Sequence, residues 1–261
     1  MELALLVAPV ALLMFSIECF TPRDRVTSPH WYPRALALST LQVAIAYLGA
    51  ATWQHWLPTP AWSGLLPPGL DVAIGYLAIT FVYYWWHRAR HEVPWLWRSM
   101  HQLHHSPVRL ELLTSFYKHP AEMLLNGLLS SLILTTFVGL DARAATLAVA
   151  VTAIAELFYH WNVRTPWWLG FLVQRPEMHC VHHERGVHTS NFSDLPLWDW
   201  LFGTWRNPRE RSIPCGFDDQ RELQLVALLS GRDVHAQDAL RDRTGAQRDR
   251  PAVVTPPSFS S

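Results

Sequence analysis

Histidine is the residue type whose number and spacing are most informative in this sequence. The chain of 261 residues contains 14 histidines, and eight of them form three tight groups. The groups are His87 and His91; His101, His104 and His105; and His179, His182 and His183. Residues three or four apart lie on one face of a helix, so each group can present its imidazoles to a common centre. Because imidazole binds Fe, Zn, Cu and Ni, this spacing predicts a metal site.

The number of imidazoles indicates more than one metal ion. A tetrahedral zinc ion takes about four ligands, whereas two ions of higher coordination number accommodate eight imidazoles and keep open positions. We therefore predict a dinuclear site at which all three groups converge. A zinc-protease HExxH motif is excluded, because Val187 and Trp95 stand where a second histidine would have to follow His183 and His91. A hydrolase is also disfavoured, since the sequence places no evident nucleophile.

Long apolar stretches are the elements that would position these histidines. Half of the residues are apolar and 16% are charged, against about 25% in a typical soluble domain. Five stretches match a hydrocarbon core of about 30 Å and predict membrane helices over 1–20, 35–57, 70–86, 121–140 and 142–161. The last two form either two crossings or a re-entrant pair. Pro94 should end the helix that carries the first histidine group and let the second group fold back towards it.

The distribution of basic residues orients these spans. Lys and Arg collect in 21–34, in 88–118 and beyond residue 164, whereas 58–69 has none. Basic loops stay in the cytoplasm, so the N-terminus is predicted outside and the three histidine groups, with the C-terminus, inside. The first stretch lacks a basic region and a cleavage site, which favours a retained membrane helix over a signal peptide. We expect an integral protein of a bacterial inner membrane.

Charge and cysteine content exclude other classes of protein. The formal net charge is zero, so no nucleic-acid partner is indicated. Cys19, Cys180 and Cys215 are far apart in sequence and argue against a disulfide framework or a thiolate zinc site. The tail after about residue 209 is polar; one short amphipathic helix is expected within 218–230, and a loose or disordered segment over 231–261.

Beyond these patterns, the chain resembles the fatty acid hydroxylase / sterol desaturase superfamily over roughly 70–208. The resemblance rests on the three histidine groups in their context, on KHPAE at Lys118–Glu122, on HWN at His160–Asn162 and on NFSDLPLWDWLFGTW at Asn191–Trp205. It implies an all-α membrane bundle of four to five spans. A cytosolic helical cap would hold a di-iron site that oxidises C–H bonds of lipids with O2.

The resemblance also implies a ligand set and a division of the chain. The eight grouped histidines match the family pattern, and His160 matches a ninth ligand position, whereas Arg164 stands where some relatives have a further histidine. The implied domains are N-terminal membrane helices (1–69), a hydroxylase-like catalytic domain (70–208) and a cytosolic tail (209–261).

Five further residues near these motifs are predicted to support the site. His119 is expected to hydrogen-bond a ligand or a carboxylate, with helix capping as the alternative. Glu156 lies one turn before His160 in an apolar stretch, where an acid indicates a role such as orienting an imidazole. His188, Asn191 and Asp194 follow the third group and are expected to hold ligand imidazoles from outside.

The expected activity is hydroxylation or desaturation of a lipid by two iron ions and O2, although zinc can replace iron in a purified sample. The substrate would be a sterol, a fatty acyl chain or another polar lipid. The sequence has neither a dinucleotide-binding motif nor a cysteine set for an iron–sulfur cluster. Electrons would therefore come from a ferredoxin or a cytochrome. A non-catalytic, zinc-binding membrane protein is the competing hypothesis.

Overall fold

The computed structural model describes residues 2–53, 56–210 and 214–236, and in this part of the chain the fold is helical, as predicted. The long helices are α1 (Glu2–Phe20), α2 (Trp31–Trp53), α3 (Leu70–Glu92), α6 (Pro120–Ser131) with its continuation η3 (Leu132–Phe137), and α7 (Ala142–His160). The short helices are α4 (Pro94–Leu96), η1 (Trp97–His101), α5 (Gln102–His105), η2 (Leu112–Phe116), η4 (Trp167–Phe171), α8 (Pro176–His182), α9 (Pro196–Leu201), α10 (Asp219–Glu222) and α11 (Leu225–Leu229).

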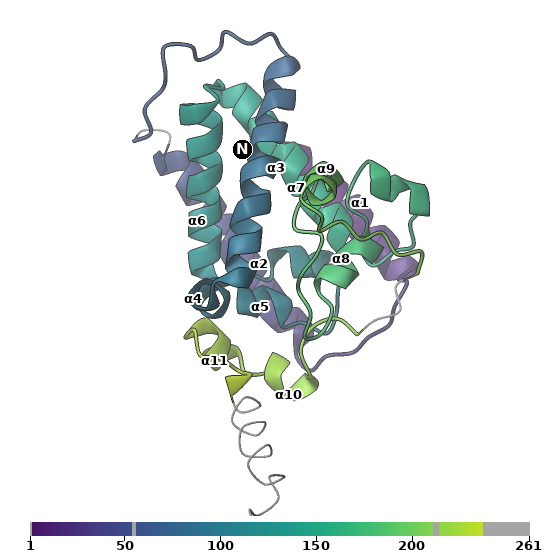
Figure 1. The fold of residues 1–261 in the computed structure, drawn as a ribbon. Coiled ribbons are helices and arrows are strands. Elements are labelled where there is room, and N and C mark those ends of the chain that lie inside the picture. The colour runs from purple at the N-terminus through teal and green to yellow at the C-terminus, as the bar shows by residue number, and fades with distance from the viewer. Residues whose placement is uncertain (1, 54–55, 211–213, 237–261) are drawn as a thin grey trace, which may run out of the picture.

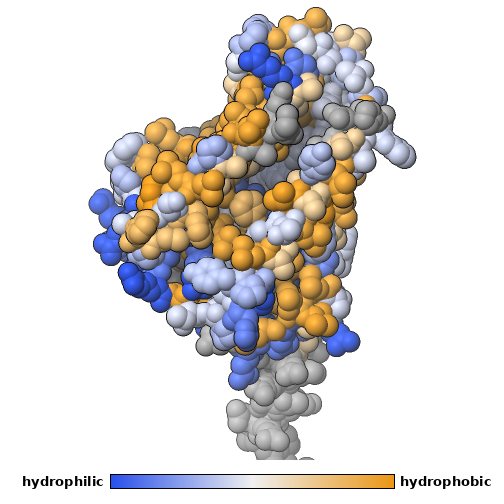
Figure 2. Space-filling view, turned by 180° about the vertical axis from the view of Figure 1, so that it is seen from behind, coloured by the Kyte–Doolittle hydropathy of each residue, from blue (hydrophilic) through white to orange (hydrophobic). Residues whose placement is uncertain are grey.

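Three of the described helices are long and apolar enough to cross a membrane: α2, α6 with η3, and α7. The predicted first span, α1, contributes a shorter apolar stretch, Leu5–Phe20. Helix α3 is as long as α2 but less apolar, because tyrosines, tryptophans and histidines fill its second half. Hydrophobic residues cover much of the surface seen from behind (Figure 2). This surface and the three spans indicate an integral membrane protein.

Helices α3, η3 and α7 share an apolar core that sets the position of α3. Its buried members include Ile79, Leu134 and Ala148. Gly75 allows the close approach, because a Cβ built there would lie 2.7 Å from a methyl carbon of Leu140. Figure 1 shows α3 and α6 side by side, with α4 and α5 at the end where the histidines of α3 lie.

The chain turns back at that end as the sequence predicts. Helix α3 ends at Glu92, and Pro94 is the first residue of α4, where the missing N–H of proline costs nothing. Helices α4, η1 and α5 then follow one another and bring the second histidine group back beneath α3. The predicted turn at Pro94 is therefore confirmed.

The tail differs from the expectation. Residues 218–230 form two short helices, α10 and α11, instead of one. The stretch after Gly231 is held in place as far as it is described, because Gln102 donates to the Arg232 carbonyl (2.8 Å) and accepts from Val234 N (3.2 Å). Val234 is buried by these contacts. The predicted loose segment beyond residue 236 lies outside the described residues.

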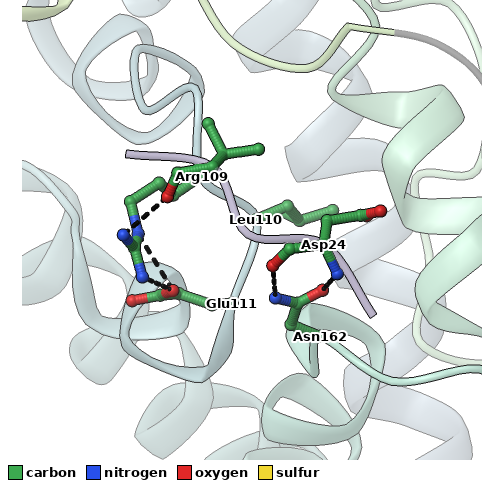
Figure 3. Close-up of a pocket in the computed structure, with 6 residues that line it drawn as sticks. Asp24, Arg109, Leu110, Glu111 and Asn162 are labelled. Atoms are coloured by element: carbon green, nitrogen blue, oxygen red, sulfur yellow. Dashed lines mark hydrogen bonds and ion pairs between the residues drawn. The ribbon is translucent and has the colours of Figure 1, made fainter. Parts of the chain in front are cut away.

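The loop after α1 is fixed to the end of α7 by polar contacts (Figure 3). The side chain of Asn162 accepts a hydrogen bond from Asp24 N (3.1 Å) and donates one to the Asp24 carbonyl (2.7 Å). These residues form one wall of a narrow pocket, and Arg109, paired with Glu111, forms the other wall. Buried Glu18 of α1 accepts from the backbone of Asn162 (2.8 Å). The N-terminal segment is therefore anchored beside the helix that carries His160.

The cysteine prediction was wrong. Cys180 and Cys215 are paired as a disulfide although 35 residues separate them. The pairing arises because α8 and the segment after residue 213 run side by side, joined by an isolated antiparallel bridge between Glu184 and Cys215. Cys180 also packs against Leu110 in a small buried cluster. Because its sulfur is bonded to Cys215, Cys180 does not serve as a metal ligand.

Candidate metal centre

The nine histidines predicted as ligands come together in two groups. Group one consists of His87, His91, His101, His105 and His182, and group two of His104, His160, His179 and His183. Within each group, one ring nitrogen of each histidine lies within 4.8 Å of those of the other members. The groups are in contact, because the rings of His105 and His183 stack with centroids 4.1 Å apart. Two adjacent sites, rather than one shared centre, are thus available for metal ions.

The repeated HxxHH pattern accounts for this division. In each copy the first and last histidines lie one helical turn apart and enter the same group: His101 and His105 in group one, His179 and His183 in group two. The middle histidine crosses to the other group, so His104 joins group two and His182 joins group one. The expectation that each triplet faces one side was therefore wrong, and the two triplets instead exchange one ligand each.

His101 lies at the middle of group one. Its Nε2 is 2.9 Å from His87 Nε2 and 3.1 Å from His105 Nε2. Both ring nitrogens of His91 and Nε2 of His182 are buried, and no atom of the described residues hydrogen-bonds them. Buried polar atoms are normally satisfied. Facing nitrogens that lack such partners fit a cation bound among them.

Group two repeats this arrangement in a fully buried setting. Nε2 of His179 is 3.0 Å from Nε2 of His160 and 3.0 Å from Nε2 of His183. The ring of His104 completes the group, with its centroid 4.9 Å from that of His183. All four side chains are buried, whereas His87 and His91 of group one are half-buried. Group one is thus the more accessible site.

Backbone carbonyls fix the tautomers of several imidazoles. Nδ1 of His87 donates to Phe192 O (2.7 Å), that of His182 to Ser190 O (2.8 Å) and that of His160 to Glu156 O (2.9 Å). A carbonyl only accepts, so the proton must reside on Nδ1 and the lone pair of Nε2 is free to face the group. This is the outer arrangement typical of metal-binding histidines.

Burial keeps these imidazoles neutral. It lowers the pKa of His104, His105 and His183 well below the ordinary range, with neighbouring imidazoles lowering it further. Burial also lowers the pKa of His182 to about 3. Neutral imidazole is the form that binds a metal, so the donors are ready for ligation near neutral pH.

The nitrogen spacing fits one metal ion in each group. Neighbouring nitrogens on a single ion with bonds of about 2.0–2.1 Å lie about 3.0–3.3 Å apart. The close Nε2 pairs in the two groups lie between 2.9 and 3.1 Å apart. The nitrogens of each group are thus spaced closely enough to share one ion.

One family model covers the part of the chain that carries the two groups. The model of the fatty acid hydroxylase family matches residues 72–204, about half of the chain. The chain belongs to the fatty acid hydroxylase family. The matched range includes all nine histidines of the two groups.

Curated relatives of this family member carry the names of lipid enzymes. A methylsterol monooxygenase of Arabidopsis thaliana is 29% identical (56% of this chain, 55% of the relative), and a very-long-chain aldehyde decarbonylase of Oryza sativa subsp. indica is also 29% identical (59% and 58%). An ornithine lipid hydroxylase of Rhizobium tropici is 32% identical (65% and 52%). The chain thus spans about half the length of these relatives. No solved structure matches it.

The side chains of four of the five supporting residues predicted for this hydroxylase-family chain contact other groups than the ligand imidazoles: His119, Glu156, Asn191 and Asp194. His119 caps α6, accepting from Ala121 N (3.1 Å), and its other nitrogen contacts Leu229 O (3.0 Å). The expected bond to a ligand or a carboxylate is therefore a wrong prediction, and the capping alternative holds. The Glu156 carboxylate pairs with Lys118 rather than with an imidazole. Residue 156 still orients His160, but through its backbone carbonyl.

The other three predicted residues, His188, Asn191 and Asp194, each make a different kind of contact. The half-buried ring of His188 is 4.7 Å from that of His105, between centroids, and covers group one. Asn191 donates to Met178 O (2.8 Å) and Arg206 O (2.9 Å), so it anchors the loop to α8 and not an imidazole. Asp194 hydrogen-bonds Tyr159, and burial raises the pKa of its carboxyl to about 7.

Sequence reasoning missed residues that hold the ligands. The amide of Gln174 lies 3.0 Å from His179 Nδ1, and Glu122 Oε1 lies 3.1 Å from His101 Nδ1. Asp199 accepts from Phe192 N (2.7 Å) and Ser193 N (2.9 Å), which fixes the carbonyl that binds His87. Glu122 could have been found as an acid in an apolar stretch. Gln174 and Asp199 carry no such signal.

Proposed function

We propose that this protein is an O2-dependent di-iron oxidoreductase that hydroxylates or desaturates a C–H bond of a lipid, with one iron ion in each histidine group. Two bound iron ions would supply the activation of dioxygen and the removal of hydrogen from an unactivated carbon. The proposal rests above all on the contact between two separate imidazole groups whose Nε2 atoms face inward. The names of the relatives support lipid oxidation as the reaction class.

The chain's own residues would bind the ions, orient the ligands and limit water. Group two is fully buried, so solvent and substrate would approach group one, where His87 and His91 are half-buried. The ring of Phe192 lies 5.4 Å from that of His91, and the ring of Trp97 lies 5.2 Å from it, between centroids. These aromatic side chains offer an apolar contact for a sterol, a fatty acyl chain or another polar lipid beside the metal ligands.

The remaining assignments are part of the same proposal. The catalytic unit would be 70–208, preceded by membrane helices in 1–69 and followed by a cytosolic tail over 209–261. The histidine end would face the cytoplasm of a bacterial cell, where a ferredoxin or a cytochrome would deliver electrons. The distribution of Lys and Arg supports this orientation.

A lipid profile of expressing cells tests the proposal. Cells with the wild-type chain, with His183→Ala and with a matched control, His30→Asn, are grown with and without O2. His30 is exposed and has a positive φ of 52°, which asparagine tolerates well. A hydroxylated or desaturated lipid should appear only with O2, persist in the control and vanish in His183→Ala. An unchanged profile in cells whose protein carries zinc would favour the non-catalytic alternative.

A further inference from the structure

A buried ion pair lies against group one. Glu122 of α6 is fully buried and Arg90 of α3 is 4% exposed. Arg90 Nη1 pairs with Glu122 Oε1, and His101 Nδ1 lies 3.1 Å from the same oxygen. A buried carboxylate is costly unless charge and hydrogen bonds compensate it. Here one guanidinium and one imidazole N–H do so at Oε1, whereas Oε2 has no hydrogen-bond partner among the described residues.

The imidazole that Glu122 contacts is the central one of group one. Nε2 of His101 approaches both His87 and His105, at 2.9 Å and 3.1 Å. Ionised glutamate only accepts hydrogen bonds, so its contact with His101 Nδ1 at 3.1 Å places the proton on Nδ1. Arg90 Nη1, which only donates, lies farther from the same nitrogen, at 3.3 Å. The lone pair of His101 Nε2 is then directed to the point where the three nitrogens meet.

Group two has outer contacts of another kind. His160 donates to the Glu156 carbonyl, His104 lies 3.4 Å from the Tyr117 carbonyl, and His179 contacts the amide of Gln174. These partners are neutral. A carboxylate that accepts from a ligand imidazole makes the imidazole a stronger donor and holds its ring in place. The contact at His101 therefore distinguishes the two groups.

We propose that Glu122, balanced by Arg90, is a positioning residue that fixes His101 as its Nδ1–H tautomer and sets the metal affinity of group one. The inference rests on the proposed metal-binding role of the two groups. It concerns one group only, so removing the carboxylate weakens one of two metal sites. The expected weakening is about 10- to 100-fold, the usual effect of losing such an outer partner.

Metal titration of purified, metal-free full-length protein tests this. Co²⁺ is added to wild type, Glu122→Gln, Glu122→Ala and the control Glu222→Gln in competition with a chelator, and the visible ligand-field bands of bound Co²⁺ are followed. Glu122→Gln keeps the size of the side chain, so it decides the question if Glu122→Ala does not fold. Glu222 is the matched control, because its carboxylate is also buried and pairs with an arginine, Arg34, but contacts no imidazole of the described residues.

The result expected is two Co²⁺ per wild-type chain and per Glu222→Gln chain. In Glu122→Gln, one Co²⁺ should bind as in wild type, and the other about tenfold or more weakly, with altered bands. Two sites of wild-type affinity in Glu122→Gln would overturn the inference and leave the proposed function standing. Equal weakening in Glu122→Gln and Glu222→Gln would overturn it too. Fewer than two ions in wild type would contradict the proposed function itself.

Discussion

At the scale of single residues, neighbouring histidines on one helix serve different sites. Successive residues of an α-helix are rotated by about 100°, so His104 and His105 cannot face the same point. The same holds for His182 and His183, which lie in groups one and two. The groups nevertheless touch, because His105 stacks on His183. Each adjacent pair of histidines therefore supplies one ligand to each group and holds the two groups next to each other.

Substituting the two stacked histidines separately should remove different ions. His105→Ala should reduce bound metal from about two ions per chain to about one by emptying group one, and His183→Ala should do so by emptying group two. Each variant removes a ligand close to its neighbours, 3.1 Å from His101 and 3.0 Å from His179. Metal analysis of purified protein measures the ratio, with His30→Asn as control. An unchanged ratio in His105→Ala would remove that residue from the ligand set.

Asp199 should make stability depend on pH. Burial raises its pKa from 3.8 to about 6, so between these values the folded state binds more protons than the unfolded state. Its contribution to stability is therefore highest below pH 4 and falls as the pH rises to about 6. Relative to wild type, Asp199→Asn should gain about 1 kcal/mol between pH 5 and pH 8. Thermal unfolding of metal-free protein at both pH values measures this; a constant difference would contradict the shift.

The nine candidate ligands could be predicted from the sequence, because local spacing and resemblance both single out histidines. Their distribution between two groups could not, since it depends on how α5 and α8 face each other. The roles of His119 and Glu156 were mispredicted for a related reason. Their partners, Leu229 and Lys118, come from distant segments whose position no local pattern reveals.

At the scale of helices, close packing at Gly75 determines the position of α3 against η3 and α7. Gly75 faces Leu140, Leu134 and Ala148, and a Cβ there would lie 2.7, 3.2 and 3.3 Å from their side-chain carbons. Helix α3 carries His87 and His91 about three and four turns further along. Packing around Gly75 is therefore connected to the placement of both ligands.

Gly75→Leu should separate α3 from α7 and destabilise the fold. Overpacking of a well-packed core costs about 1–3 kcal/mol. The matched control is Ala73→Leu, which adds the same side chain on the exposed face of α3. Thermal unfolding in detergent should show a lower midpoint for Gly75→Leu and little change for the control. Equal midpoints for the two variants would mean that α3 and α7 do not pack closely at Gly75.

The helix boundaries that could be predicted from the sequence are those set by a single residue. Pro94 separates α3 from α4, and Asp141 caps α7 through Ala144 N (2.8 Å), where the break between the last two spans was predicted. The tail was less predictable. The burial of Val234 depends on contacts with Gln102, which lies 130 or more residues earlier in the sequence.

At the scale of the whole molecule, the candidate metal centre lies at one end of the helices. The connection between α2 and α3 lies at the other end of α3 (Figure 1). Three helices are apolar and long enough to cross a bilayer between these ends. The basic residues lie mainly on the histidine side, as a cytoplasmic orientation requires.

Cysteine labelling of intact and broken cells should verify this orientation. In a variant without native cysteines, Ser63→Cys lies in the connection between α2 and α3, and Thr189→Cys lies at the exposed loop after α8. A membrane-impermeant maleimide should label the first in intact cells and the second only after the cells are broken. The opposite pattern would place the histidine end outside.

The central claim, oxidation of a lipid by O2 at the two histidine groups, is tested most directly with ¹⁸O₂. Purified, iron-loaded protein is given a reducing system and extracted membrane lipids under ¹⁸O₂, and the lipids are analysed by mass spectrometry. We predict O2 consumption together with a lipid that has gained one ¹⁸O atom or lost two hydrogens, absent in His183→Ala. Wild-type protein that holds two iron ions, consumes no O2 and leaves every lipid unchanged would contradict the account.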